Sequence, residues 1–410
     1  MRLKVSRSVL AAFLAAVLLL ACGSAAAEKT ITITFTGDMT LGCKDNERNY
    51  EDCFDNVVKK KGYDYFLADF KEMFKKDDLT VINLEGPLTD ITANRIQKNH
   101  PMRGSTDFVK ILTRSGIDAA SLSNNHMGDY GAQGETSTKK TLEANKIKWF
   151  TEFNYYMFEK DGIRIAIFGL TNSVLNKQRP KFIKAIQEAR DKDGADAVIV
   201  CWHTGTEYKG THDAYAETGA WLLIRDAGIN LFIINHPHVA LGTAVFNNST
   251  VFYALGNFVF GGNRTIRAGK DSKDPYAISL YGMVVQAKLT FTDGGRYLGQ
   301  QMNVYPVFSS SSRPDYKVGE GWPPNVSDRA LYPNGEVFVN DYRPMRLTVA
   351  QAADVYECIR RDSSIEVPAM KEKDGFAVIE FPYLPSADTA EAAAAPEAAK
   401  PKPSRNNKGK

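Results

Sequence analysis

Short apolar runs that alternate with amphipathic segments constrain the fold of this 410-residue chain more than any other feature. Compact runs of this kind predict strands that are covered on both faces. They occupy residues 30–36, 79–84, 119–123, 163–170, 197–201, 231–234 and 251–255. Apolar residues at three- and four-residue spacing predict helices between them, at 64–76, 105–115, 135–145, 179–192 and 213–227. Strands that alternate with helices indicate a layered α/β domain over about residues 29–265.

The second part of the chain continues this domain in our interpretation. Its sequence predicts strands at 281–291, 298–307 and 376–381, a loop-rich segment at 308–345 and a helix at 347–361. We therefore expect one folded domain over residues 28–385. Residues 386–410 carry no large apolar side chain among the Ala, Glu, Pro and Lys that dominate them. Such a composition cannot bury enough surface to order itself, so we expect a disordered tail.

The first 27 residues have the composition of an export signal. Three cations precede an apolar run at residues 9–20, which is short for a membrane span but suits a signal peptide. Two processing sites are open. Residues 19–22 resemble a lipobox, which would make Cys22 a lipidated, membrane-anchored first residue, whereas residues 25–27 offer an A-x-A site for ordinary cleavage. Either site predicts an exported protein, periplasmic or at the cell surface.

Charge and cysteine usage narrow the classes of partner. The formal net charge is +3, and the cations of the signal and of the last residues leave the remainder at about −5. Nothing in this balance indicates the basic face or stripe that nucleic-acid binding requires, so we expect no nucleic-acid partner. In an oxidising compartment Cys43 and Cys53 could close a short disulfide loop or could remain thiols. The spacing of the cysteines leaves both states open.

Polar side chains follow the predicted strands at the points where these strands end. They are Asp38, Glu85, Asn124, Asn125, His126, His203, Glu207, His236, His238 and Asn257. Ligand sites of open α/β sheets form at the carboxyl ends of strands, so we expect these groups to meet at one edge. Carboxylate oxygens and neutral imidazoles suit one or two divalent ions of Mn, Zn or Fe. Such a centre activates water for hydrolysis, and a histidine outside the ligand set can act as general acid.

Each of these residues also has a simpler structural interpretation. Asp38 could cap a helix, Glu85 could lie in a solvated turn, and His203 could be a satisfied core histidine. His236 and His238, which flank a proline directly after an apolar run, are the hardest to explain without a ligand. Two further histidines, His100 and His212, fall in predicted loops or helix starts, and we interpret them as surface residues.

Six ordered blocks resemble a known family. TGDMTLG, NLEGPLT, LSNNHMGDYG, HTGTEY, HPHV and LGNFVF follow one another between residues 36 and 260. They are similar to the bacterial capsule synthesis proteins of the CapA type, which are associated with poly-γ-glutamate. That family looks like a divergent branch of the calcineurin-like metallophosphoesterases. The resemblance implies a four-layer αββα sandwich with mixed sheets, an extracytoplasmic location, and capsule synthesis machinery, an anionic polymer or a phosphoester as partners.

The resemblance also implies roles for single residues. It implies metal ligands at Asp38, Glu85, Asn125, His203, His236 and His238. It leaves His126 as the acid or as an orienter of a bound phosphate, and Asn124, Glu207 and Asn257 as supporting residues beside the ligands. The chain departs from metallophosphoesterases in its first block, where Met39 and Thr40 follow Asp38 in place of an Asp-x-His pattern, and in Glu85, which stands where an aspartate usually bridges two metals. Three functions stay open: a capsule-type metallohydrolase that acts on a phosphoester or on the polymer's amide bond, a non-catalytic polymer-binding assembly factor, and a phosphatase unrelated to capsule.

Overall fold

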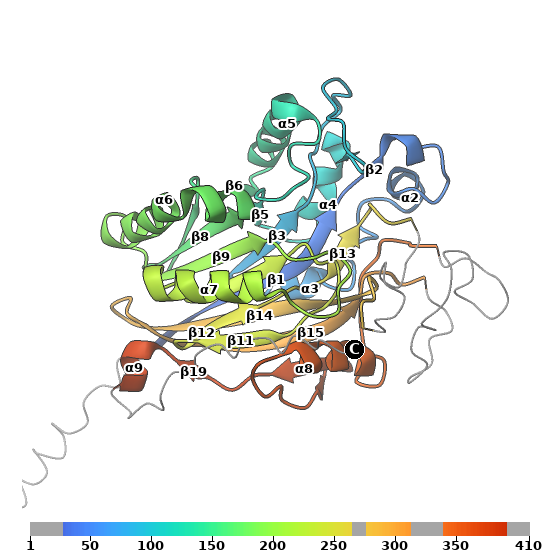
Figure 1. The fold of residues 1–410 in the computed structure, drawn as a ribbon. Helices are drawn as coiled ribbons and strands as arrows, with labels where there is room; N and C mark the ends of the chain where they lie inside the picture. Colours follow the sequence, from blue (N-terminus) through green and yellow to red (C-terminus); the bar gives the residue numbers. More distant parts are fainter. Residues whose placement is uncertain (1–27, 265–275, 313–338, 392–410) are drawn as a thin grey trace, which may run out of the picture.

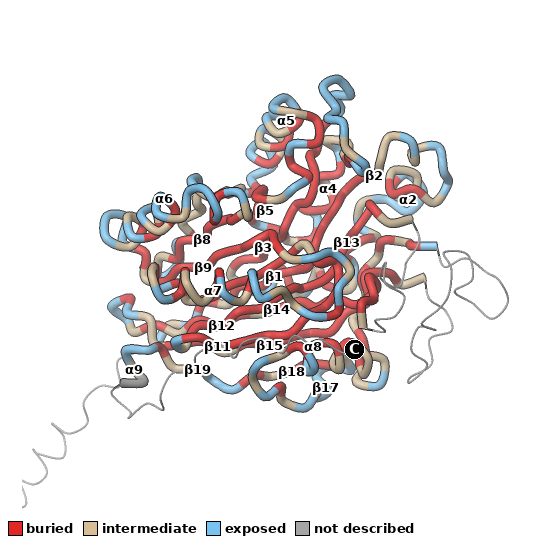
Figure 2. Tube along the Cα trace, viewed as in Figure 1, coloured by how far each residue is buried: buried red, intermediate tan, exposed pale blue. Residues whose placement is uncertain are grey.

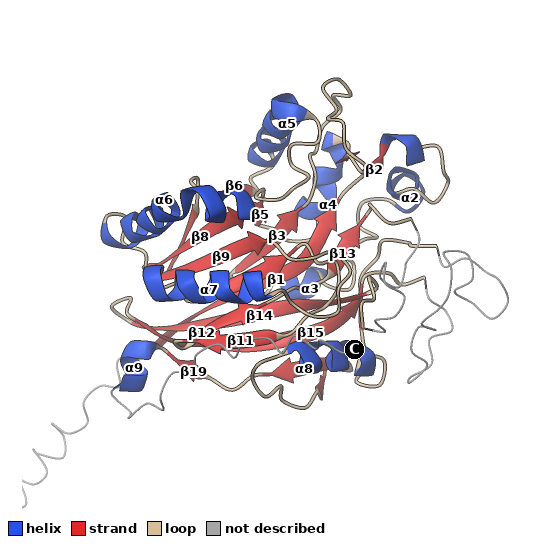
Figure 3. Ribbon diagram, in the orientation of Figure 1, coloured by secondary structure: helices blue, strands red, loops and turns tan. Residues whose placement is uncertain are grey.

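The computed structural model of this chain describes residues 28–264, 276–312 and 339–391. Two mixed sheets stack face to face, and helices cover the outer face of each (Figures 1 and 3). This arrangement confirms the predicted four-layer αββα sandwich. Among the described residues, no helix has the length and apolarity needed to cross a membrane.

The larger sheet is built around the long first strand. In spatial order it contains β17 (Lys371–Lys373), β18 (Phe376–Glu380), β15 (Tyr297–Phe308), β14 (Tyr281–Thr292), β1 (Glu28–Thr40), β3 (Leu79–Leu84), β5 (Ala119–Ser121) and β6 (Lys148–Phe150). Three short strands join its flanks: β13 (Asn257–Phe260) beside β1, and β16 (Met345–Arg346) and β19 (Leu384–Pro385) beside β15. Strands β3, β5, β6 and β13 run parallel with β1, so their carboxyl ends meet at one edge.

The second sheet has a parallel centre and antiparallel edges. Its order is β11 (Thr243–Phe246), β12 (Ser249–Phe252), β10 (Leu231–Asn235), β9 (Ala197–His203), β8 (Ile163–Thr171) and β7 (Tyr156–Lys160). A separate two-stranded ribbon pairs β2 (Cys43–Lys44) with β4 (Met102–Arg103). Strands β8, β9 and β10 therefore also end together, with His203 of β9 level with Asn235 of β10.

The helices separate into two outer layers. The larger sheet is covered by α2 (Phe54–Lys61), α3 (Lys71–Phe74), α4 (Val109–Thr113) and α5 (Gly131–Ala144), and the second by α6 (Asn172–Asp191) and α7 (Ala214–Ala227). Single 3₁₀ turns lie at Asp45–Glu47 and Thr106–Phe108. Two further helices, α8 (Ala353–Asp362) and α9 (Ala387–Glu391), lie on the β15 side of the sandwich (Figure 1).

Apolar layers fill the three interfaces of the sandwich, and the strands are the most buried elements (Figure 2). Ile33 of β1, Ile167 of β8 and Ile199 of β9 belong to the layer between the sheets. On β8 and β9 the next residues, Phe168 and Val200, turn outward under α6 and α7. Strands covered on both faces consist mostly of apolar residues, which is why they appear in the sequence as nearly continuous apolar runs.

The predicted elements are recovered with a few corrections. The helix predicted at 64–76 is reduced to α3, because residues 62–70 form turns while Phe66, Leu67 and Phe70 remain buried. The strand predicted at 251–255 is the second half of a hairpin, β11–β12, whose turn places Asn247 and Asn248 at positive φ. The helix predicted from 347 begins at Ala353.

The end of the domain also differs from the expectation. Helix α9 and the buried Ser386 lie inside the segment expected to be a disordered tail. The rest of that segment, 392–410, lies outside the described residues, as do the predicted signal at 1–27 with Cys22 and most of the loop-rich segment.

Candidate metal centre

The register of the strands gathers the predicted site residues at the carboxyl edge of both sheets. Asp38, near the end of β1, is level with Asn83 of β3 on one side and with Asn257 of β13 on the other. Glu85 directly follows β3, and His203 ends β9. His236 follows β10 by one residue, and its backbone N–H donates to Oδ2 of Asp38 at 3.2 Å. This last contact joins the two sheets at the site.

A close backbone approach explains the glycine before Asp38. A Cβ atom on Gly37 would lie 2.2 Å from the carbonyl oxygen of Gly256, and the N–H of Asp38 donates to the same oxygen at 2.8 Å. Gly256 itself has a φ of 71°, in the left-handed region that glycine tolerates. The TGD and LGN segments therefore fit against each other only because both contain glycine.

Glu85 lies at the centre of the cluster and has no hydrogen-bond partner on either carboxylate oxygen. The side chain is fully buried. Its Oε1 atom lies 3.6 Å from Nε2 of His203, and 3.9 Å from Nε2 of both His126 and His238. Buried carboxylates are normally paired, so a buried carboxylate that faces several imidazole nitrogens without a hydrogen bond has the donor chemistry that a cation requires.

His238 is held with one nitrogen aimed at Glu85. Its Nδ1 lies 3.0 Å from Oδ1 of Asn257 and 3.2 Å from Oδ2 of Asp38, both of which are acceptors. These acceptors place the proton of the neutral ring on Nδ1 and leave the lone pair of Nε2 facing Glu85. Asn257, which also donates to the carbonyl of Ser279 at 3.2 Å, thus orients a predicted ligand.

His203 is held by two amides. Nδ2 of Asn83 lies 3.2 Å from Nδ1 of His203 and donates to Oδ1 of Asp38 at 2.8 Å. On the other side of the ring, Oδ1 of Asn125 lies 2.9 Å from Nε2. Asn125 is exposed, so it forms the rim of the site, whereas Asn83 is buried beneath it. Asn83 is a site residue that sequence reasoning missed, although it opens the NLEGPLT block.

His236 adopts an unusual backbone conformation. Its φ is 107° and that of His238 is 59°, both positive for residues that carry a Cβ. The His236 ring centroid lies 4.6 Å from that of His203 and 5.9 Å from that of His238. Its Nδ1 is buried without a partner. Backbone strain that persists at such a position is usually held by a functional constraint, and here it keeps three rings together.

His126 approaches Glu85 from a turn with its own supporting contacts. Its Nδ1 lies 2.8 Å from Oδ2 of the fully buried Asp129. Lys98 reaches over this pair, with Nζ 2.5 Å from Oδ1 of Asp129 and 3.1 Å from the carbonyl of Asn125. The carboxylate fixes the ring so that Nε2 faces the cluster. Asp129 and Lys98 were not predicted; the only sequence signal was Asp129 three residues after His126.

The two remaining supporting residues occupy different positions. Asn124 donates to the carbonyl of Leu84 at 2.8 Å, and its own oxygen accepts from the backbone N–H groups of His126 and Met127. It therefore shapes the turn that carries His126. Glu207 is exposed on the loop after β9. Burial lowers the pKa of His236 to about 4, and the Glu207 carboxylate is among the nearby charges that oppose this shift.

The electrostatics of the cluster favour a bound cation. Burial, and then the neighbouring Asp38 carboxylate, raise the pKa of Glu85 well above its usual range. Burial lowers the pKa of His203 well below normal, so this ring is neutral. Burial also opposes a charge on His238, but Glu85, Tyr208 and Asp38 together outweigh it and raise the pKa of His238 well above normal. The protonated ring of His238 thus supplies positive charge beside these carboxylates, and a divalent ion would supply positive charge at the same place.

Two overlapping sets of side chains have donor atoms close enough to share one ion. Asp38, Glu85 and His203 form the first, and Glu85, His236 and His238 form the second, each with its donor atoms within 4.8 Å of one another. Glu85 belongs to both sets. This arrangement fits one ion or two ions bridged by Glu85, with oxygen and nitrogen donors suited to Mn, Zn or Fe.

Comparison with known proteins identifies the family. The family described as "Bacterial capsule synthesis protein PGA_cap" matches residues 32–262, more than half of the chain. The chain belongs to this family. It is 29% identical over 255 residues to the capsule biosynthesis protein CapA of Bacillus anthracis, covering 56% of this chain and 60% of that protein. It is 28% identical over 255 residues to the PGA biosynthesis protein CapA of Bacillus subtilis (strain 168), covering 57% of this chain and 64% of that protein. In each case the match spans under two thirds of the relative.

Solved structures with a similar arrangement are more distant. A hypothetical protein from Thermus thermophilus matches with a TM-score of 0.40 and 14% identity, covering 67% of this chain and 99% of that chain. The calcineurin-like phosphoesterase YfkN from Bacillus subtilis matches with a TM-score of 0.34 and 18% identity, covering 66% of this chain and 88% of that chain. Scores of this size carry no conclusion about the site.

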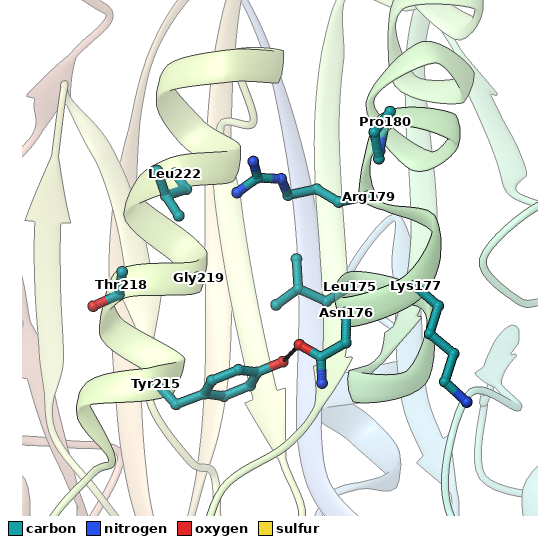
Figure 4. Close-up of a pocket in the computed structure, with 9 residues that line it drawn as sticks. All are labelled: Leu175, Asn176, Lys177, Arg179, Pro180, Tyr215, Thr218, Gly219 and Leu222. Carbon is teal, nitrogen blue, oxygen red and sulfur yellow. Dashed lines mark hydrogen bonds between the residues drawn. The ribbon is translucent and has the colours of Figure 1, made fainter.

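A groove between α6 and α7 is lined by none of the residues of the candidate metal centre (Figure 4). Its volume is about 420 Å³, and its floor includes Leu175 and Gly219. The hydroxyl of Tyr215 donates to Oδ1 of Asn176 at 2.8 Å across it. Trp202, the neighbour of His203, packs behind it with its ring centroid 5.9 Å from that of Tyr215. The residues that line this groove include no carboxylate, imidazole or thiol, so they offer no metal chemistry.

Two other sequence expectations concern His212 and the pair of Cys43 and Cys53. His212 is not a surface residue: it stacks on Tyr253 with centroids 3.8 Å apart, and its Nδ1 lies 2.9 Å from Oδ1 of Asp362. The predicted loop position was right, but the packing of α8 against that loop could not be seen in the sequence. Cys43 and Cys53 are buried and carry free thiols in the structure.

Proposed function

We propose that this protein is an exported metal-dependent hydrolase of capsule synthesis that cleaves a phosphoester of an anionic substrate. The observation that carries the proposal is the buried, unpartnered Glu85 carboxylate facing the Nε2 atoms of His126, His203 and His238. A fully desolvated carboxylate without a partner destabilises a fold, so its presence favours a function that requires it.

The ligand set that supports the proposal comprises Asp38, Glu85, Asn125, His203, His236 and His238. The chemistry that a divalent ion supplies in such a set is the acidification of a water molecule and the neutralisation of charge on the leaving oxygen. Asn83 and Asn257 orient the imidazoles of His203 and His238 through the contacts described above.

His126 supplies the proton in this proposal. Its Nε2 faces the cluster, while Asp129 binds Nδ1 and stabilises the protonated ring. Donation from Nε2 to the leaving oxygen would leave a neutral ring with its remaining proton on Nδ1, where the carboxylate accepts it. Burial lowers the pKa of His126, and Asp129 opposes this shift.

The membership in the capsule family supports the biological setting, and the signal-like first 27 residues support export with Cys22 as a lipid anchor. Replacing Cys22 with Ser tests the anchor separately. Loss of membrane attachment in a cell fractionation would support it, and unchanged attachment would contradict it.

Hydrolysis tests the enzymatic part. The purified protein, supplied with Mn or Zn, should release p-nitrophenol from mono- or bis-p-nitrophenyl phosphate. His236→Ala should abolish this release without altering the melting temperature of the metal-free protein by more than a few degrees. Turnover that is unaffected by chelators or by His236→Ala would contradict the proposal. Metal binding without turnover would favour the non-catalytic polymer-binding factor instead.

A further inference from the structure

We propose that Cys43 and Cys53 form a disulfide bond that closes the loop between β2 and α2 and holds it against the turn of His126. Both side chains are fully buried. Their sulfur atoms and a carboxylate oxygen of Asp55 all lie within 4.8 Å of one another. Nine residues separate the two cysteines, so the bond closes a short loop.

The present partners of the two thiols are weak. Sγ of Cys43 donates to Oδ2 of Asp55 at 3.2 Å, and Sγ of Cys53 donates to the carbonyl of Arg48 at 3.5 Å. Hydrogen bonds from thiols contribute little to stability, so replacing them with a covalent bond between the sulfur atoms would cost little stability. Cys53 also precedes helix α2, and its backbone contacts with Asn56 and Val57 do not involve the sulfur atom.

A metal ion is the alternative occupant, and the surrounding charges disfavour it. Arg48 forms an ion pair with Asp55, and its guanidinium also donates to Oδ1 of Asp45 and to the carbonyl of Arg103. The one carboxylate of the cluster is therefore already neutralised by a fixed cation. Metal binding would require both thiols to lose protons. Burial, followed by the charge of Asp55, raises the pKa of the Cys43 thiol well above its usual range.

The loop between the cysteines supports the candidate metal centre. Oδ2 of Asp45 accepts from the hydroxyl of Tyr130 at 2.6 Å, and Oδ1 of Asp45 pairs with Arg103 at 3.1 Å. Tyr130 directly follows Asp129, which binds His126. At its start, the loop continues from Thr40, whose hydroxyl donates to the carbonyl of Glu85 at 2.8 Å. A bond between the cysteines would hold both connections.

The bond forms by exchange with a small-molecule disulfide such as oxidised glutathione. One protein thiolate attacks a sulfur of glutathione disulfide, which forms a mixed disulfide and releases one glutathione thiolate. The second protein thiolate then displaces the other glutathione and completes the Cys43–Cys53 bond. The protein loses two electrons and two protons, and two molecules of reduced glutathione carry them. Because both sulfur atoms are buried in the folded chain, exchange occurs while the chain folds.

Peptide mapping tests the bond directly. The full chain is reduced, unfolded and refolded in mixtures of reduced and oxidised glutathione, and remaining thiols are blocked with N-ethylmaleimide in denaturant before trypsin digestion. Trypsin cuts after Lys44 and Arg48, between the two cysteines, so peptides 30–44 and 49–59 stay together only through the disulfide. We expect this linked pair, which reduction separates, while the buried Cys201 and Cys358 carry the maleimide.

Recovery of both peptides as maleimide adducts at every glutathione ratio would overturn the proposal. Zinc that copurifies with the chain and is lost in a Cys43→Ser, Cys53→Ser variant would also overturn it, in favour of a metal site.

The thermal stability of the wild-type protein, with and without reductant, tests whether the disulfide holds the loop in place. Reduction of the linked form should lower the melting temperature by roughly 5 °C and speed trypsin cleavage of the native protein at Arg48. The Cys43→Ser, Cys53→Ser variant should have the melting temperature and cleavage rate of the reduced wild type, and added reductant should change neither. An identical melting temperature and cleavage rate for linked and reduced wild type would contradict the role of the bond in holding the loop.

Discussion

Oε1 of Glu85 and Nε2 of His203 lie 3.6 Å apart at the carboxyl edge of the two sheets, and neither oxygen of this buried carboxylate has a hydrogen-bond partner. The two residues come from different sheets, since Glu85 follows β3 and His203 ends β9. The sandwich therefore places a buried carboxylate without a hydrogen-bond partner at its inter-sheet edge. Such an arrangement favours cation binding at the expense of stability in the empty protein.

Neutralising Glu85 should reveal this cost. We expect Glu85→Gln to raise the free energy of unfolding of the metal-free protein by about 1–3 kcal/mol, because it removes an unpartnered buried carboxylate. The pKa of Glu85 is higher in the folded protein than in the unfolded chain, so the wild type loses stability as the pH rises above the normal value of 4.5. Glu85→Gln lacks this carboxyl group, so its stability should not fall with pH for this reason. Urea unfolding at several pH values measures both effects. Glu72→Gln, at an exposed position, is the matched control. A less stable Glu85→Gln protein would show that the carboxylate is satisfied.

Removing the imidazole of His126 should separate catalysis from metal binding. His126→Ala is expected to lower kcat for phosphoester hydrolysis by about 10²–10⁴, the usual range for a general acid, while metal content is retained. Asp129→Asn should lower kcat less and shift the pH profile, because the ring stays in place with a weaker acceptor at Nδ1. Metal analysis beside steady-state kinetics distinguishes these outcomes. If His126→Ala loses its metal, the ring is a ligand and not the acid.

Much of the fold and part of the site follow from the sequence alone. The runs at 79–84 and 163–170 coincide with β3 and β8 almost to the residue, because strands buried on both faces are mostly apolar along their length. The gathering of Asp38, Glu85 and the histidines followed from the rule that parallel strands end at one edge.

Other parts depend on contacts between distant segments. Asn83 looks like any polar residue at a strand end until β1 and β9 bring Asp38 and His203 to its amide. Lys98 lies in a loop without periodicity, and only the fold carries it to Asp129. The β11–β12 hairpin was missed despite a local signal: Asn247-Asn248 between two alternating apolar runs is a turn sequence suited to positive φ.

The crossing of β1 and β13 should tolerate no side chain at Gly37. Gly37→Ala places a methyl group 2.2 Å from the carbonyl of Gly256, so the strands must separate and Asp38 must move. We expect a loss of at least about 2 kcal/mol in unfolding free energy and weaker metal binding. Gly128→Ala, where an added Cβ meets nothing within 4 Å, is the control and should change neither quantity. Equal stability of the two variants would disprove the close approach.

The His212–Asp362 pair should make stability depend on pH. Burial opposes the charge on His212, but Asp362 outweighs it and raises the pKa of His212. A raised folded pKa stabilises the protein fully below the unfolded value of about 6.5, and this contribution is lost as pH rises through the folded value. His212→Gln should therefore cost about 1–2 kcal/mol at pH 6 and less at pH 9. The pH dependence should vanish in an Asp362→Asn background. A cost that is constant from pH 6 to pH 9 would contradict the pairing.

The binding of a divalent ion is the central claim, and metal content after equilibrium dialysis tests it most directly. The purified protein is stripped of metal with a chelator and dialysed against Mn or Zn. Its metal content is then measured by elemental mass spectrometry, in parallel with that of Glu85→Gln and of the control Glu72→Gln. The ligand geometry predicts one or two equivalents in the wild type and in Glu72→Gln, with a clear loss in Glu85→Gln. Wild-type protein that stays metal-free, or a Glu85→Gln protein that binds the same amount, would contradict the account.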